Sequence, residues 1–126
     1  MKKIVESPNA PKPVGPYSQA VEAGGFLFCS GQIAIDPKTN EVLKGSVEAQ
    51  SKMVMENIRG VLTAAGLNFE HVIKTTIYLT SMHDFATVNQ VYGSYFPKEP
   101  PARSTVEVSG LLKGVQVEVE VLAKRP

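Results

Sequence analysis

The chain has 126 residues with 13 basic and 12 acidic side chains, a net charge of +1 that argues against nucleic acid and membrane surfaces as default partners. A single cysteine, Cys29, excludes an internal disulfide and fits a reducing compartment, and no stretch approaches the ~20 apolar residues of a membrane span. Polar residues and prolines follow the basic start where a signal peptide would need an apolar run, so we expect one cytoplasmic domain covering residues 1–126.

The first part of the chain predicts an irregular arm followed by a hairpin. Residues 1–16 are rich in proline, and the runs 17–23 and 26–30 are typical of strands. Gly24-Gly25 between them indicates a two-residue turn. Gly31 follows the second strand, where we expect an ordinary bend, although glycine there also permits a close approach of the backbone to a ligand.

The middle of the chain predicts two helices with a strand between them. Apolar residues recur at helical spacing between Ser46, a suitable N-cap, and Gly66, a suitable closing glycine. Residues 71–80 alternate as a strand does. Asp84 is placed to cap a second helix, whose buried side carries an aromatic stripe and which Pro97 closes. We interpret this stripe as core.

The last two alternating runs predict an antiparallel hairpin. The prolines of Pro100-Pro101 restrict the backbone to extended conformations, so we expect a strand to begin at Arg103. With Val108 opposite Val115, Arg103 would lie opposite Glu120 and diagonal to Glu118, all on one sheet face. On the pattern alone these are solvent-exposed charge pairs. The position of Arg103 also suits bidentate binding of a carboxylate.

The order of elements predicts an α+β fold in which two helices pack on one face of a mixed sheet. The other sheet face then needs water or another subunit. His71 and His83 are far apart in sequence, and nucleotide-binding and nucleophile-elbow motifs are missing, so we expect neither metal nor cofactor. Any enzyme here would work by charge positioning and an activated water.

Five segments of the chain resemble the RidA/YjgF family of enamine and imine deaminases. They stand in the family's order and spacing: Gly15-Pro16-Tyr17-Ser18-Gln19, Ser30-Gly31-Gln32, Asp84-Phe85-Ala86-Thr87-Val88-Asn89, Pro101-Ala102-Arg103-Ser104 and Val117-Glu118-Val119-Glu120. The resemblance implies a chorismate-mutase-like fold and a homotrimer, with the sheets forming a central barrel and clefts at the subunit interfaces. It also implies hydrolysis of 2-imino acids, such as 2-iminobutanoate and 2-iminopropanoate, to 2-oxo acids and ammonia without a cofactor.

The resemblance also implies roles for individual residues. By position, Arg103 matches the family's carboxylate-binding arginine, and Glu118 matches the glutamate that holds the attacking water. Many members carry a cysteine where this chain has Thr105, which argues against a role for a thiol and leaves a contact by the backbone N–H. Four more residues match positions that line the cleft: Tyr17, Ser30, Gly31 and Asn89.

Two other functions stay open on the sequence. The same cleft could bind small carboxylates as a regulatory module without turnover. The chain could also be an endoribonuclease or translation inhibitor, a role reported for some relatives, although its near-neutral charge and the lack of a basic aromatic groove argue against this.

Overall fold

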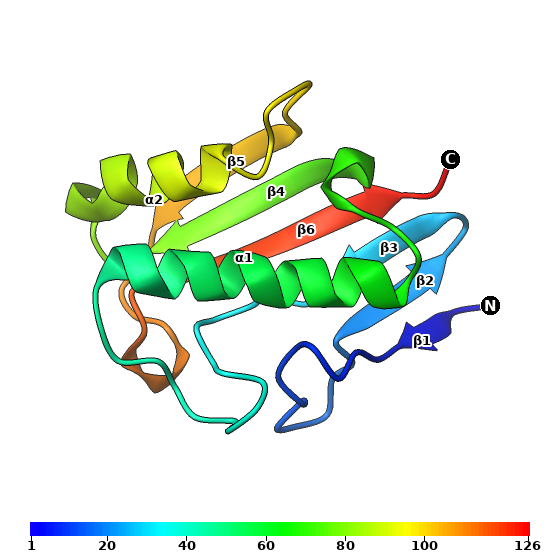
Figure 1. Cartoon of the computed structure of the whole chain (residues 1–126), viewed down its shortest axis with the longest axis horizontal. Helices are drawn as coiled ribbons and strands as arrows, with labels where there is room; N and C mark the ends of the chain where they lie inside the picture. The colour runs from blue at the N-terminus through cyan, green and yellow to red at the C-terminus, as the bar shows by residue number, and fades with distance from the viewer.

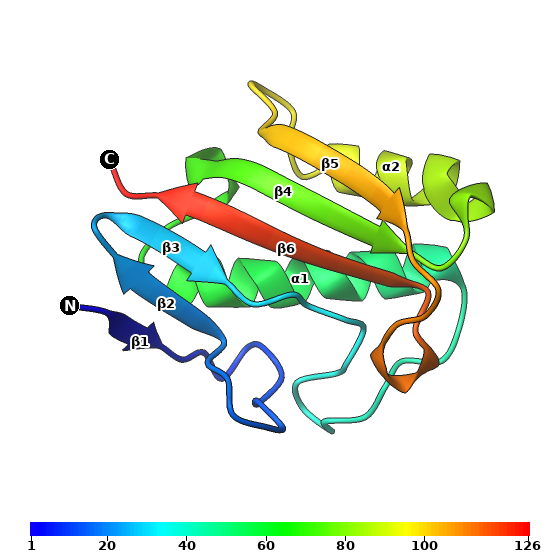
Figure 2. The same cartoon turned by 180° about the vertical axis from the view of Figure 1, so that it is seen from behind.

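A computed structural model describes residues 1–126 and places two helices on one face of a six-stranded sheet (Figures 1 and 2). The sheet order is β1-β2-β3-β6-β4-β5, and only the β4–β5 pair is parallel. The predicted α+β class, mixed sheet and one-sided helical layer are therefore confirmed. The elements are β1 (Lys3–Val5), β2 (Ala20–Ala23), β3 (Phe26–Cys29), α1 (Val47–Ala64), β4 (Val72–Leu79), α2 (Phe85–Gly93), β5 (Ala102–Glu107) and β6 (Val117–Lys124).

Helix α1 lies across the sheet and begins and ends where the sequence predicts. Its N-cap Ser46 accepts a hydrogen bond from the Ala49 N–H at 3.1 Å. Gly66 after its last turn has a φ of 75°, a conformation that favours glycine. The inner side of α1 is buried against β6, and neither helix is long and apolar enough to cross a membrane.

Helix α2 covers the β4–β5 end of the sheet (Figure 1). The predicted cap by Asp84 is wrong: this residue has helical backbone angles and its side chain makes no cap hydrogen bond. A short 3-10 turn, Met82–Asp84, precedes the helix instead, and Ser81 caps that turn. The sequence pattern did not distinguish the extra turn from the start of the helix.

The predicted hairpin of the last two strands is also wrong, because β4 lies between β5 and β6. Strand β5 pairs in parallel with β4, and β6 pairs with β4 in the antiparallel sense. The connecting segment 108–116 passes over the end of β4 and is held there at both ends. The Val108 N–H donates to the Leu79 carbonyl at 2.8 Å, and the Thr80 N–H donates to the Gln116 carbonyl at 3.2 Å. A loop of this length does not impose the direct return of a tight two-residue turn.

This topology separates the charges that the sequence placed together. Arg103 pairs with Thr75, whose side chain is buried on the helix-covered face. Glu118 and Glu120 pair with the β4 residues that point to the open face, Tyr78 and Thr76. Since paired residues of neighbouring strands point to the same side, Arg103 and the two glutamates lie on opposite faces of the sheet. The expectation that they share a face is wrong.

Candidate functional site

Arg103 lies on the edge strand β5, against helix α2. Its Nη1 donates a hydrogen bond to Asn89 Oδ1 at 2.7 Å. The guanidinium carbon lies 5.1 Å from the centroid of the Tyr92 ring and 5.5 Å from that of Phe85. The ion pairs of the chain all lie elsewhere, so the charge of Arg103 has no acidic partner. A cation held in this way is suited to bind an anionic ligand.

Two hollows flank Arg103. One, of about 460 Å³, is lined by Asn89, Tyr92 and Pro101 among others, and one of about 380 Å³ is lined by Met82, Phe85, Arg103 and Thr105. The hydroxyl of Thr105 is buried without a hydrogen-bond partner. Because a buried unpaired hydroxyl is unfavourable, this group has capacity for a hydrogen bond from or to a ligand.

A larger cleft of about 750 Å³ lies between the N-terminal arm, the segment after β3, and strand β6. Its lining includes Tyr17, Ser30, Gly31 and Glu118. Tyr17 is 50% exposed, and Leu112, which also lines the cleft, is 76% exposed. Ser30 Oγ donates to the Ser18 carbonyl, which leaves its oxygen free to accept a hydrogen bond.

Glu118 is half-buried in this cleft and receives no hydrogen bond from the chain. Burial raises the pKa of its carboxyl, and the negative charge of Glu120 raises that pKa further. A carboxylate that is partly desolvated and unpaired is a stronger base than one on an open surface. Glu118 can therefore hold a water molecule and accept a proton from it.

Gly31 is required because Glu118 packs against its backbone. A Cβ atom built on Gly31 would lie 2.9 Å from Glu118 Cδ and closer still to Oε2. The segment is held in place by reciprocal backbone hydrogen bonds between Gln32 and Val119, at 2.8 and 3.1 Å. The expectation of an ordinary bend is wrong, since the glycine leaves room for the carboxylate.

Glu120 has a different partner from the one that the sequence indicated. Tyr78 Oη donates a hydrogen bond to Glu120 Oε1 at 2.7 Å, and this bond raises the pKa of Tyr78. Glu120 also lines the large cleft. Its carboxylate is thus fixed by the neighbouring strand, whereas that of Glu118 remains available.

The site residues predicted from the sequence fall into two groups. Tyr17, Ser30, Gly31 and Glu118 line the large cleft, whereas Asn89, Arg103 and Thr105 line the hollows along α2. The large cleft shares no residue with these hollows, and Arg103 and Glu118 lie on opposite sheet faces. One chain alone does not bring both side chains onto one small ligand.

Sequence reasoning missed the contact of Phe85 and Tyr92 with Arg103. We interpreted their aromatic stripe as core, and Tyr92 is indeed only 5% exposed. The missed signal is their spacing with Asn89: residues 85, 89 and 92 fall on one face of a helix. That face meets β5, where the rings of Phe85 and Tyr92 support the guanidinium of Arg103.

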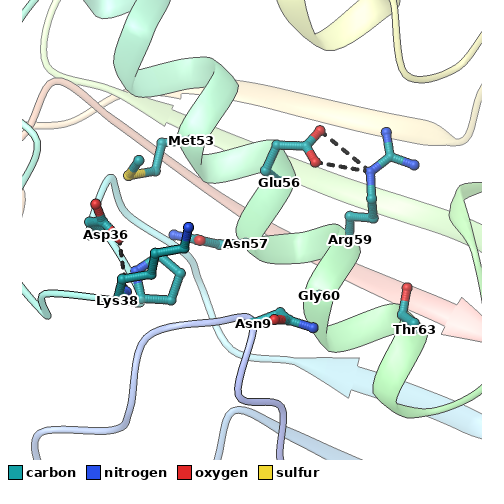
Figure 3. Close-up of a pocket in the computed structure, with 10 residues that line it drawn as sticks. Asn9, Asp36, Lys38, Met53, Glu56, Asn57, Arg59, Gly60 and Thr63 are labelled. Carbon is teal, nitrogen blue, oxygen red and sulfur yellow. Dashed lines mark hydrogen bonds and ion pairs between the residues drawn. The ribbon is translucent and has the colours of Figure 1, made fainter.

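A third hollow, of about 470 Å³, lies along α1 beside the turn at Asp36 (Figure 3). Polar side chains in it are engaged within the chain. Glu56 pairs with Arg59 and accepts from Tyr95 Oη, and Asp36 accepts from the Lys38 N–H. None of the predicted site residues lines this hollow, so its geometry does not indicate a reactive site.

The single cysteine of the chain is buried. Burial raises the pKa of the Cys29 thiol to about 12, so this sulfur stays protonated at neutral pH. No group of three or more His, Cys, Asp or Glu side chains is arranged to hold a metal ion. The chemistry that the geometry offers is a free guanidinium and a free, half-buried carboxylate.

Comparisons with known proteins cover nearly the whole chain. The family described as Endoribonuclease L-PSP matches residues 7–125. A RutC family protein of Pyrococcus horikoshii is 54% identical over 123 residues, which make up 98% of each chain. The 2-iminobutanoate/2-iminopropanoate deaminase of Mus musculus is 39% identical over 98% of this chain and 91% of its own. The crystal structure of Escherichia coli TdcF with bound serine has a TM-score of 0.94 at 40% identity, and the match covers 98% of this chain and 99% of that chain.

Proposed function

Because this chain belongs to the RidA/YjgF family, whose sequence model is described as Endoribonuclease L-PSP, we propose that it hydrolyses 2-imino acids to 2-oxo acids and ammonia. One observation carries the proposal: an arginine without an acidic partner and a half-buried glutamate without a hydrogen-bond donor. The substrate class consists of 2-iminobutanoate, 2-iminopropanoate and similar imines. A Mus musculus relative bears that name, and the serine bound by TdcF has a carboxylate beside a nitrogen-bearing carbon, as the imines have.

The active site forms between subunits of a homotrimer. Within one chain, Arg103 and Glu118 lie on opposite faces of the sheet and do not reach the same small substrate. Each site therefore takes the two residues from two different chains. The open sheet face offers a surface for this assembly, because Phe28 and Val106 on it are 51% and 41% exposed. A closed ring of three chains repeats one such contact and gives three equal sites.

Arg103 anchors the substrate through its carboxylate. A planar guanidinium can bind both carboxylate oxygens and so fix the orientation of the adjacent imine carbon. The buried hydroxyl of Thr105 and the backbone N–H of the same residue offer further donors beside it. The anchored substrate extends into the large cleft of the neighbouring subunit, where Glu118 lies.

Glu118 orients the attacking water and transfers its proton. As the water oxygen bonds to the imine carbon, the carboxylate accepts one water proton and returns it to the nitrogen, giving a carbinolamine. In the second step the C–N bond breaks and a C=O bond forms, while Glu118 carries the hydroxyl proton to the departing ammonia. Burial raises the pKa of Glu118 and so favours both transfers, because it makes the carboxylate a stronger base for the proton of the water.

Two other functions are distinguished from this proposal by experiment. The test is release of ammonia and 2-oxobutanoate from freshly generated 2-iminobutanoate, faster than the spontaneous rate. A regulatory carboxylate-binding module would bind 2-oxobutanoate without accelerating this release. A ribonuclease, the activity named in the family description, would cleave RNA and would leave the release of ammonia from the imine at its spontaneous rate.

A further inference from the structure

The three arginines of this chain have different partners. Arg125 forms a bidentate pair with Glu22, with Nη2 to Oε1 at 2.7 Å and Nε to Oε2 at 3.1 Å, and Arg59 pairs with Glu56. Arg103 alone is bound by a neutral amide, that of Asn89. Two of the arginines therefore pair with a carboxylate in the folded chain, whereas Arg103 does not.

We propose that Asn89, Phe85 and Tyr92 form a neutral cradle, which positions Arg103 while leaving its charge unpaired for the substrate carboxylate. The proposal rests on the proposed role of Arg103 as the carboxylate anchor. It assigns Asn89 as a positioning residue whose lack of charge is essential. An acidic residue would keep the same hydrogen bond but would neutralise the arginine.

The contacts of the cradle leave part of the guanidinium free. The two aromatic rings contact it at 5.1 and 5.5 Å, distances typical of cation–π interactions. Asn89 accepts a hydrogen bond from Nη1 only, and Arg103 donates no other side-chain hydrogen bond within the chain. Nη2 and Nε therefore remain available, and these two donors match the two oxygens of a carboxylate.

The Tyr92 ring is itself fixed in place. Its hydroxyl shares a hydrogen bond of 2.7 Å with Thr75 Oγ1, and both residues are almost fully buried. Thr75 is also the residue of β4 that pairs with Arg103 on β5. The ring that supports the guanidinium is thus anchored on the strand beside it, which limits the motion of Arg103 before substrate binds.

The decisive variant is Asn89→Asp, which preserves shape and acceptor but adds a negative charge. We expect the Kd for 2-oxobutanoate, measured by calorimetry on the assembled protein, to rise about fivefold. The ligand must then break the new ion pair between the introduced carboxylate and Arg103, and an exposed ion pair costs about this much to break. Melting temperature should stay equal or rise, because an aspartate accepts the same bond more strongly. A merely structural role of Asn89 predicts unchanged affinity for this variant.

The matched control is Gln90→Glu, which adds the same charge to the next, exposed residue of α2. We expect it to leave the Kd within about twofold, because surface charges outside direct contact are screened. Phe85→Leu should raise the Kd about two- to fivefold by removing one ring face. In imine turnover the cradle variants should raise KM more than they lower kcat.

The outcomes separate this proposal from the proposed function. Equal affinities of wild type and Asn89→Asp would overturn the neutral cradle, as would an equal loss in Gln90→Glu. A wild type that binds no 2-oxo acid would also overturn it, because the cradle serves only to present Arg103 to a carboxylate. A wild type that binds 2-oxobutanoate tightly but hydrolyses no imine would overturn the deaminase and leave the cradle standing.

Discussion

Arg103 and Glu118 lie on opposite faces of the same sheet, on strands separated by β4. Each has what the proposed chemistry requires: Arg103 has an unpaired charge, and Glu118 has an unpaired, half-buried carboxylate. Since one chain does not bring them together, the proposed activity and the proposed assembly depend on each other.

Replacing Arg103 tests the carboxylate anchor. We expect Arg103→Lys to lower kcat/KM for 2-iminobutanoate about tenfold or more, because lysine retains the charge but loses the planar fork. Arg103→Ala should lose still more, with the oligomer unchanged in light scattering. Full activity in Arg103→Ala would remove the anchor from the account.

The two glutamates should differ in function. Glu118→Gln keeps the shape and removes the base, so we expect kcat to fall about a hundredfold while the affinity for 2-oxobutanoate changes little. Glu120→Gln should retain most activity, because Gln can still accept the Tyr78 hydrogen bond. The opposite ranking of the two variants would show that Glu120 is the base.

Local elements of the fold could be predicted from the sequence, whereas the pairing of distant strands could not. The cap at Ser46, the glycine at 66 and the turn at Gly24-Gly25 each depend on neighbouring residues only, and the structure confirms them. The pairing of Arg103 with Thr75 depends on where β4 lies in the sheet. Alternation within β5 and β6 shows which residues share a face of one strand, and it carries no information on β4 between them.

The candidate site was likewise predictable in part. The resemblance selects residues that the structure does place in clefts, but it does not show that they form two separate groups. The role of Gly31 is an example of what the sequence does not reveal. A side chain at position 31 would collide with the Glu118 carboxylate, 87 positions later in the chain, and no local pattern signals that contact. The cradle of Asn89 depends in the same way on the packing of α2 against β5.

The close contact at Gly31 gives a further prediction. Gly31→Ala must displace the Glu118 carboxylate, so we expect turnover to fall about tenfold to a hundredfold, as for a misplaced catalytic group. Gly45→Ala is the control, because a Cβ atom there meets nothing within 4 Å. Turnover should be compared in variants that have equal circular dichroism. Wild-type turnover in Gly31→Ala would mean that Glu118 acts from another position.

The raised pKa of Glu118 predicts a pH-dependent stability. A carboxyl whose pKa is higher in the folded chain than in the unfolded chain disfavours folding once it ionises. Glu118→Gln should therefore melt at a higher temperature than wild type at pH 7. The two melting temperatures should converge as the pH falls below 4.5, the ordinary pKa of glutamate. A difference that is constant across this pH range would contradict the assignment.

The most direct test of the account is to mix two inactive variants. Arg103→Ala and Glu118→Gln are co-expressed with different tags, and assemblies carrying both tags are purified and assayed with freshly generated 2-iminobutanoate. If each site takes Arg103 from one subunit and Glu118 from its neighbour, random mixing restores about a quarter of the wild-type sites, and purified mixed trimers about a third. Activity no higher than that of the separate variants would contradict a site shared between subunits.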